Sequence, residues 1–153
     1  MSLEIERKFL VDTSKLPKLE NGKKMIQGYL QQRSPSIRIR VQDNAAFLTI
    51  KGDAKNNITR TEFEYNIPIK DAKELLKECK GLLISKTRYE ILHKNHLWEL
   101  DIFENENSGL IVAEIELEDE NEEFALPEWV TTEVSSDPRY TNASLSELPY
   151  SQW

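Results

Sequence analysis

Charged and apolar residues alternate with a period of two along segment after segment of this chain. The pattern begins with Glu4-Ile5-Glu6-Arg7-Lys8. Because successive side chains of a β-strand point to opposite faces, Glu4, Glu6 and Lys8 would stand together on one face of a strand. One such strand is common on a protein surface, but here the pattern returns many times. The alternation therefore predicts a fold made mainly of strands with one charged and one apolar face.

Eight segments carry this pattern and are expected to form strands. They are residues 2–11, 25–32, 36–42, 45–51, 59–67, 84–91, 97–103 and 110–118. Short turn signals separate several of them, at Asp43-Asn44, Lys94-Asn95 and Ser108-Gly109. Such close spacing favours antiparallel hairpins over parallel strands joined by helices.

Three short helices are expected between and after the strands. Apolar residues at helical spacing, an acidic first residue and a glycine just past the end predict a helix over residues 71–79. Residues 119–126 are acidic at their start and stop at a proline, and residues 142–148 also end before a proline. The expected class is mainly β with a few short helices on its outer side (α+β).

The charges on the predicted strands are segregated by sign. The cations on the charged faces are Lys8, Arg38, Arg40, Lys51, Lys86 and Arg88, and the anions are Glu4, Glu6, Glu62, Glu64, Asp101, Glu114 and Glu116. Two architectures satisfy the pattern. One is a sandwich with an apolar core and its charged faces toward water; the other is a closed barrel with the charges lining its lumen. Closure would also remove the edge strands of a long antiparallel sheet.

A lumen with this many charges would hold water or counter-ions, because desolvating the charges is costly. Cations clamp phosphate oxygens, whereas carboxylates hold a hard divalent metal such as Mg²⁺ or Mn²⁺, which also bridges to phosphates. A single phosphate could not use all of these cations, but a chain of two or three phosphates could. In the barrel architecture, the sequence therefore predicts a site for a metal-bound polyphosphate.

Composition limits the partners and the setting of the chain. The 153 residues suffice for one domain, and no linker or repeat divides residues 1–153. A net charge of −7 makes a nucleic-acid backbone an unfavourable partner. No apolar run is long enough to span a membrane, and the single Cys79 suits a reducing compartment. We expect a cytoplasmic protein with neither nucleic-acid nor membrane partners.

The ordered motifs resemble those of the CYTH superfamily, also called the triphosphate tunnel metalloenzymes. Glu4, Glu6 and Lys8 match its N-terminal E-x-E-x-K signature. Further matches, in chain order, are Gly28-Tyr29-Leu30, Ile37-Arg38-Ile39-Arg40, Leu48-Thr49-Ile50-Lys51-Gly52, Glu62-Phe63-Glu64, Lys86-Thr87-Arg88-Tyr89, Trp98-Glu99-Leu100-Asp101, Ala113-Glu114-Ile115-Glu116-Leu117, and Glu133-Val134 with Asp137, Arg139-Tyr140 and Asn142. The resemblance spans nearly the whole chain. It implies an eight-stranded antiparallel barrel whose tunnel binds triphosphate.

The resemblance also implies roles for the charged residues. The phosphate-binding residues would be Lys8, Arg38, Arg40, Lys51, Lys86 and Arg88, with Arg139 as a seventh. The ligands of Mg²⁺ or Mn²⁺ would be Glu4, Glu6, Asp101, Glu114 and Glu116. The residues taking part in catalysis would be Lys8, Arg40, Glu62 and Glu64. Either Glu62 or Glu64 would orient the attacking water or hold the cations in place.

The activity implied by the resemblance is metal-dependent hydrolysis of inorganic triphosphate to pyrophosphate and phosphate, as in compact bacterial members of the family. A class IV-type adenylate cyclase, or a thiamine or nucleoside triphosphatase, on the same fold is left open. A non-catalytic module that binds polyphosphate or nucleotides belongs to another class, and the paired carboxylates argue against it. The preferred metal and a homodimeric state are also left open.

Overall fold

The structure, a computed structural model, describes residues 2–153. Its strands are β1 (Leu3–Val11), β2 (Lys23–Gln31), β3 (Ser36–Gln42), β4 (Ala45–Lys51), β5 (Thr59–Asn66), β6 (Lys80–His93), β7 (His96–Phe103), β8 (Ile111–Leu117) and β9 (Val130–Glu133). Its α-helices are α1 (Ile69–Leu76) and α2 (Asn142–Leu145). Four short 3₁₀ turns complete it: η1 (Thr13–Lys15), η2 (Asn105–Asn107), η3 (Pro138–Tyr140) and η4 (Tyr150–Gln152). Within this part of the chain, neither helix is long and apolar enough to cross a membrane.

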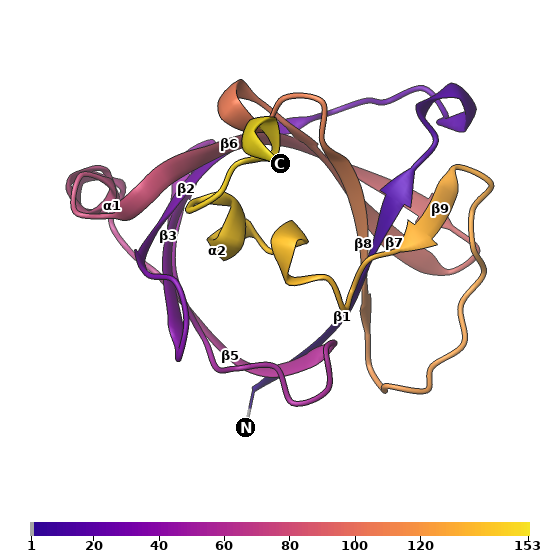
Figure 1. The fold of residues 1–153 in the computed structure, drawn as a ribbon, viewed down its shortest axis with the longest axis horizontal. Coiled ribbons are helices and arrows are strands. Elements are labelled where there is room, and N and C mark those ends of the chain that lie inside the picture. The colour runs from indigo at the N-terminus through magenta and orange to yellow at the C-terminus, as the bar shows by residue number, and fades with distance from the viewer. Residues whose placement is uncertain (1) are drawn as a thin grey trace.

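The sheet closes on itself. Its strands lie in the order β5-β4-β3-β2-β6-β7-β8-β1, and the pairing of β5 with β1 completes the ring, while β9 adds a ninth strand beside β1. The neighbouring strands are antiparallel. In Figure 1 the strands form a nearly circular wall, with α1 outside it and α2 within its outline. The predicted eight-stranded closed barrel is confirmed, and the alternative sandwich is excluded.

The register of the strands places charged residues directly opposite one another. Lys8 of β1 is the cross-strand partner of Glu114 on β8, and Arg88 of β6 is the partner of Asp101 on β7. Directly opposed residues of an antiparallel pair project to the same face of the sheet. Here that face is the inside of the barrel, so the period-two pattern of the sequence becomes a charged lumen.

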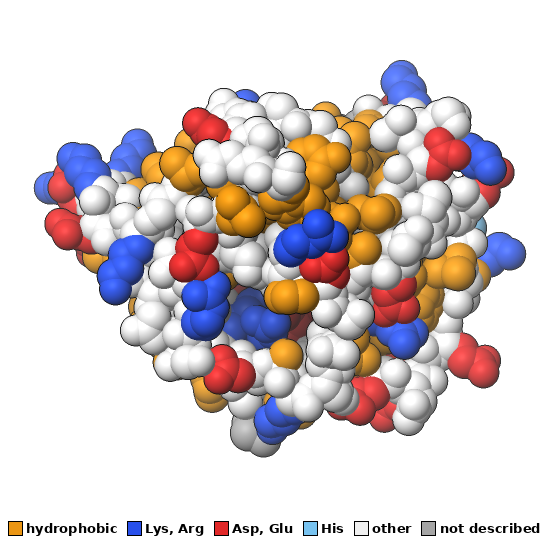
Figure 2. Space-filling model, viewed as in Figure 1, with side chains coloured by type: hydrophobic (Ala, Val, Ile, Leu, Met, Phe, Trp, Pro, Cys, Tyr) orange, Lys and Arg blue, Asp and Glu red, His pale blue; other side chains and the backbone are white. Residues whose placement is uncertain are grey.

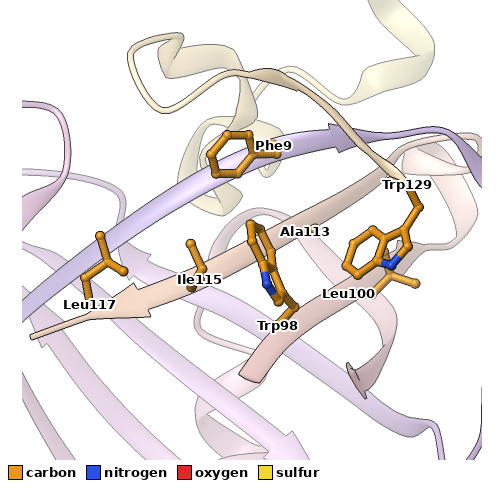
Figure 3. Close-up of a cluster of buried hydrophobic side chains, with 7 residues drawn as sticks. All are labelled: Phe9, Trp98, Leu100, Ala113, Ile115, Leu117 and Trp129. Carbon is orange, nitrogen blue, oxygen red and sulfur yellow. The ribbon is translucent and has the colours of Figure 1, made fainter. Parts of the chain in front are cut away.

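One large group of apolar side chains packs on the outside of the barrel wall, whereas Phe103 and Val112, the cross-strand partners of Lys86 and Asp101, pack on its inner face with Val134 and Tyr140. The largest cluster consists of Phe9, Trp98, Leu100, Ala113, Ile115, Leu117 and Trp129, drawn in Figure 3. Trp98 is fully buried, and its ring meets those of Phe9 and Trp129 edge to face at centroid distances of 5.6 and 5.8 Å. Such aromatic pairs contribute about 0.5–1.5 kcal/mol each beyond the area they bury. This cluster fixes β1, β7 and β8, three of the strands that carry lumen charges.

A second group of apolar residues lies under α1. Ala72, on the inner side of this helix, is fully buried and packs with Ile39 and Ala46 of β3 and β4. Helix α1 begins after Pro68, which cannot supply a side-chain cap, and it ends at Leu76 with Lys77 as its C-cap, whereas Gly81, the expected end signal, lies within β6. The helix expected over residues 71–79 thus forms two to three residues earlier than the capping signals indicated.

The turns predicted at Asp43-Asn44 and Lys94-Asn95 are confirmed as two-residue loops, whereas Ser108-Gly109 is part of a longer connection between β7 and β8 that includes η2. Gln42 pairs with Ala45 and His93 with His96, so each hairpin has a two-residue loop. Lys94 and Asn95 both have positive φ, at 44° and 71°. This conformation gives the turn the twist that matches two antiparallel strands.

Two helix predictions were wrong in part or in full. Residues 119–126 form a turn instead of a helix, because side chains capture the backbone amides there: Asn121 N donates to Asp119 Oδ1, and Glu118 N to Glu122 Oε1. The helix over residues 142–148 shortens to α2 and lies against the lumen, where an outer helix was expected. The short strand β9 was not predicted.

Candidate functional site

The lumen contains a cavity of about 440 Å³. Twelve residues predicted for the site line it: Glu4, Glu6, Lys8, Arg38, Arg40, Lys51, Glu62, Glu64, Lys86, Arg88, Glu114 and Glu116. Figure 2 shows basic and acidic side chains together at the floor of a hollow in the face viewed down the barrel. The barrel register therefore gathers into one space residues that are spread over more than 110 positions of the chain.

The chain after β9 covers part of this cavity. Lys8 Nζ donates to the backbone oxygen of Tyr140 at 3.0 Å, and the backbone N of Lys8 donates to Ser135 Oγ at 3.0 Å. The side-chain oxygen of Asn142, the first residue of α2, accepts from Lys86 Nζ at 3.1 Å. Residues 134–143 thus sit against the lumen through hydrogen bonds from two predicted phosphate-binding lysines.

Three carboxylates meet at the junction of β1, β5 and β8. Oxygens of Glu4, Glu62 and Glu116 lie within 4.8 Å of one another. Lys51 Nζ donates to both oxygens of Glu4, at 2.8 and 3.0 Å, and lies 3.4 Å from Glu62. The Lys51 ammonium group therefore pairs with two of the three clustered carboxylates, which leaves a surplus of negative charge.

Burial and this surplus of negative charge shift the pKa values of these acids. Burial, followed by the charge of Glu4, raises the pKa of Glu62 to about 7 and also raises the pKa of Glu116. Burial alone would raise the pKa of Glu4 as well, but the Lys51 ammonium offsets it and leaves this pKa below its ordinary value. Clustered hard oxygen ligands with uncompensated charge are the donor set that a divalent cation such as Mg²⁺ takes. The three acids fit such an ion.

Glu6 and Glu114 lie next to this cluster, and their pKa values are shifted in opposite directions. Burial and the charges of Glu114 and Glu4 raise the pKa of Glu6 well above its ordinary value. Burial would also raise the pKa of Glu114, but Lys8 and Arg88 outweigh it and hold this pKa well below the ordinary value. Lys8 Nζ lies 3.8 Å from Glu114, and Arg88 Nη2 lies 3.3 Å from it.

Arg38, Lys86 and Arg88 of the cavity wall are also paired with acids. Arg88 Nε and Nη2 donate to the two oxygens of Asp101 at 2.7 and 2.8 Å, and Lys86 Nζ donates to Asp101 at 2.7 Å. Burial lowers the pKa of Lys86 to about 7, with Asp101 opposing this shift and Arg88 adding to it. Arg38 donates to Thr49 Oγ1 at 3.1 Å and lies 3.5 Å from Glu64.

Two of the residues predicted for the site do not line the cavity. Asp101 is fully buried behind Lys86 and Arg88, and the hydrogen bonds to these two residues occupy both of its oxygens. Arg139 pairs with Asp137 at 2.8 Å and lies over the Trp153 ring, 4.6 Å from its centroid. Neither residue therefore faces the cavity, although Asp101 contacts two cations that do.

Three residues of this region were not among those predicted for the site. Arg60 and Glu99 line the cavity; the period-two pattern put Glu99 beside Asp101 without giving it a role, and the same pattern reaches Arg60, two positions before Glu62. Gln27 is fully buried and accepts a hydrogen bond from Arg40 Nε at 2.8 Å. A search for charged residues cannot find an uncharged amide, and only the fold reveals its contact.

A closed antiparallel barrel with both acids and cations lining its lumen defines a class of protein that can hold a polyanion together with a divalent cation. The cations offer donors to phosphate oxygens, and the clustered carboxylates offer ligands to the metal. The CYTH domain profile matches residues 2–147. The chain belongs to the CYTH domain family.

Two relatives resemble the chain over nearly its full length. An inorganic triphosphatase of Acetivibrio thermocellus is 42% identical over 152 residues, which cover 98% of this chain and 97% of that protein. An inorganic triphosphatase of Nitrosomonas europaea is 36% identical over 148 residues, covering 94% and 96%. Each of the two relatives is similar enough to this chain to share the whole barrel with its lumen.

Solved structures share the fold. The crystal structure of an inorganic triphosphatase matches with a TM-score of 0.67 and 34% identity, covering 95% of each chain. A protein of Pyrococcus horikoshii matches with a TM-score of 0.62 and 22% identity, covering 77% of this chain and 80% of that one. At that lower identity the similarity supports only a shared fold.

Proposed function

We propose that this protein is a divalent-metal-dependent triphosphatase that hydrolyses inorganic triphosphate to pyrophosphate and phosphate. One observation carries the proposal: six cations predicted to bind phosphate line the same cavity as a cluster of three carboxylates that could hold a metal ion. The relatives named inorganic triphosphatase, which match along nearly the whole chain, support the choice of substrate. The lining of the cavity is dominated by charged and polar side chains, as a phosphate chain without an organic group requires.

The cations of the lumen would bind the phosphates. The proposed set is Lys8, Arg38, Arg40, Lys51, Lys86 and Arg88. Arginine can donate two parallel hydrogen bonds to one phosphate, and lysine acts as a point charge. We assign no phosphate contact to Arg139, because its guanidinium group is engaged by Asp137 and Trp153.

Glu4, Glu62 and Glu116 would hold Mg²⁺ or Mn²⁺, with Glu6 and Glu114 beside them. When bound, such a metal neutralises phosphate charge and acidifies a water molecule. Asp101, predicted from the sequence as a ligand, is proposed instead to hold Lys86 and Arg88 in place through its two occupied oxygens.

Hydrolysis would proceed by in-line attack on a terminal phosphorus. The water oxygen would form a bond to phosphorus as the bond from phosphorus to the bridging oxygen breaks; pyrophosphate would leave with the electron pair, and the proton lost by the water would pass to bulk solvent. Glu62, at the carboxylate cluster, would orient the water; Glu64 accepts from Thr49 Oγ1 at 2.9 Å and would hold Arg38. The lumen cations stabilise the charge that develops on the phosphate oxygens, and this is the main source of acceleration in such reactions.

Phosphate release by the purified protein tests the proposal. Inorganic triphosphate, ATP and thiamine triphosphate are supplied separately, each with EDTA, Mg²⁺ or Mn²⁺. We expect rapid metal-dependent release from inorganic triphosphate and slow release from the two organic substrates. The same assay on Lys24→Met, whose lysine pairs with Glu104 away from the cavity, should match the wild type.

Two results would count against the proposal. Cyclic AMP and pyrophosphate formed from ATP would show an adenylate cyclase. Binding of triphosphate without phosphate release under any metal condition would show a binding module. In either case the cavity would still bind a triphosphate group, but it would not catalyse the proposed hydrolysis of inorganic triphosphate.

A further inference from the structure

Arg40 differs from the other predicted phosphate-binding cations. Each of the others has a carboxylate oxygen within 4.0 Å: Lys8 has Glu114, Arg38 has Glu64, Lys51 has Glu4, Lys86 and Arg88 have Asp101, and Arg139 has Asp137. Among residues 2–153, Arg40 has no such partner. Its side chain is nevertheless buried, and burial together with the charges of Arg38 and Arg88 lowers the pKa of Arg40 to about 9.

A buried guanidinium without a counter-charge is costly unless other groups satisfy it. Arg40 is held by one neutral contact, from its Nε to Gln27 Oε1 at 2.8 Å. Gln27 is fully buried on β2, directly across from Arg40 on β3. Because the hydrogen bond uses Nε, the two terminal nitrogens of the guanidinium group remain for a ligand in the cavity, which Arg40 lines.

The orientation of the Gln27 amide is fixed at both ends. A guanidinium group only donates, so the amide oxygen must face Arg40 and the amide nitrogen must point away. That nitrogen donates to Asn142 Oδ1 at 3.1 Å and lies 3.4 Å from the Tyr29 hydroxyl. Asn142 Oδ1 also accepts from Lys86 Nζ, which likewise only donates. The two cations thus set the direction of the bridge formed by Gln27 and Asn142.

From this geometry we propose that Gln27 is a positioning residue that aims the Arg40 guanidinium group at the substrate while leaving its positive charge uncompensated. The inference rests on the proposed function. A glutamate at this position would also hold Arg40, but it would neutralise the charge and turn a second carboxylate oxygen toward Asn142 Oδ1. An apolar residue of the same length would leave Arg40 Nε without an acceptor. Only a neutral amide provides orientation and keeps full attraction for an anion.

The test compares Gln27→Glu and Gln27→Met with the wild type. Binding of inorganic triphosphate is measured calorimetrically in EDTA, and KM and kcat are measured with Mg²⁺. We expect each variant to raise the dissociation constant about tenfold or more, equivalent to about 1.4 kcal/mol, with the larger change in KM than in kcat. Gln42→Glu is the matched control, because Gln42 lines the same cavity without a hydrogen bond to Arg40, and it should raise the dissociation constant by less than about threefold.

A double-mutant cycle asks whether Gln27 acts through Arg40. In an Arg40→Ala background, Gln27→Met should weaken triphosphate binding no further. An undiminished loss in that background, an equal loss in Gln42→Glu, or wild-type affinity in both Gln27 variants would overturn the inference. Thermal melts without ligand identify variants that misfold. If Gln27→Met unfolds, the affinity of the near-isosteric Gln27→Glu still tests the inference.

The inference and the proposed function fail in different ways. If the wild type hydrolyses inorganic triphosphate and the Gln27 variants bind it equally well, only the role of Gln27 is refuted. If the wild type binds triphosphate without hydrolysing it, the proposed function is refuted, while the affinities in EDTA still decide the role of Gln27.

Discussion

Asp101 is the buried carboxylate on which two cations of the lumen depend. Both of its oxygens are taken, by Lys86 Nζ and by Nε and Nη2 of Arg88. Period-two reading placed Asp101 on the charged face correctly, but it does not reveal how deep each inward side chain lies. Depth depends on which partners the neighbouring strand brings, and here β6 brings two long cations over a short acid.

Asp101→Asn should lower the free energy of unfolding at pH 7 by about 3–5 kcal/mol, because it leaves two buried cations without their counter-charge. Urea denaturation measures the change. Glu99→Gln is the control: Glu99 pairs with Arg88 alone at 3.1 Å and its side chain is 31% exposed, so the loss should stay below about 1 kcal/mol. Equal losses in the two variants would contradict the special position of Asp101.

The contribution of Asp101 should also depend on pH in one direction. Burial would raise the pKa of Asp101, but the charges of Lys86 and Arg88 outweigh it and place this pKa below the ordinary value. A lowered carboxyl pKa stabilises the fold fully above the unfolded pKa of about 3.9, and the contribution is lost as the pH falls through the lower folded pKa. The part of the stability difference between wild type and Asp101→Asn that comes from the Asp101 charge should therefore shrink as the pH falls below about 4. A difference that did not shrink below pH 4 would contradict this assignment.

Glu116 offers a direct test of the carboxylate cluster. Glu116→Gln should raise the Mg²⁺ concentration for half-maximal activity about 10-fold or more, since it replaces one charged oxygen ligand of three. Glu118→Gln removes the same charge two residues further along, from an exposed side chain that does not line the cavity, and should leave that concentration unchanged. An unchanged Mg²⁺ requirement in Glu116→Gln would remove Glu116 from the proposed ligands.

The hairpins were the most predictable elements of the fold. The strands expected over residues 36–42 and 45–51 have the bounds of β3 and β4, because alternation and the Asp43-Asn44 turn specify the same register. The acidic segment 119–126 was mispredicted because helix signals such as early acids are also the groups that form local side-chain turns. Its place is set by tertiary contacts that no local pattern contains, including Thr59 Oγ1 to Glu120 at 2.7 Å and His96 with Glu122 at 2.6 Å.

The close contact between β6 and the chain after α2 requires a glycine at position 81. Gly81 has a φ of 72°, and a Cβ at this position would lie 2.4 Å from the backbone oxygen of Ser146. Gly81→Ala should therefore destabilise the protein by more than the roughly 1–3 kcal/mol of a strained backbone alone. Gly109→Ala is the control, since Gly109 also has a positive φ, 96°, but its Cβ would come no closer than 3.4 Å to Tyr150. Equal shifts of the melting temperature in the two variants would show that the close approach to Ser146 has no effect.

Closure of the whole barrel depends on a short seam. β1 and β5 share three residue pairs, Leu3 with Thr61, Glu4 with Arg60 and Ile5 with Thr59, whereas β1 and β8 share six. The carboxylate cluster spans this seam, because Glu4 belongs to β1 and Glu62 to β5. Two acids that repel each other across the shortest pairing of the ring weaken it, and a cation bound by both strands would join them.

Mg²⁺ should consequently protect the seam more than the rest of the barrel. In hydrogen–deuterium exchange, millimolar Mg²⁺ should slow exchange about tenfold in peptides covering residues 2–6 and 58–66, and leave residues 84–92 of β6 unchanged. The Glu116→Gln variant separates metal binding from general salt effects, because it keeps the seam but loses one proposed ligand, and the protection should fall with its Mg²⁺ affinity. Uniform protection of all strands, or none at a Mg²⁺ concentration that supports full activity, would show that the metal does not bridge β1 and β5. Selective protection would mean that the metal-bound site keeps the barrel closed in addition to binding the substrate. The stability of the barrel and the enzymatic activity would then depend on the same bound metal.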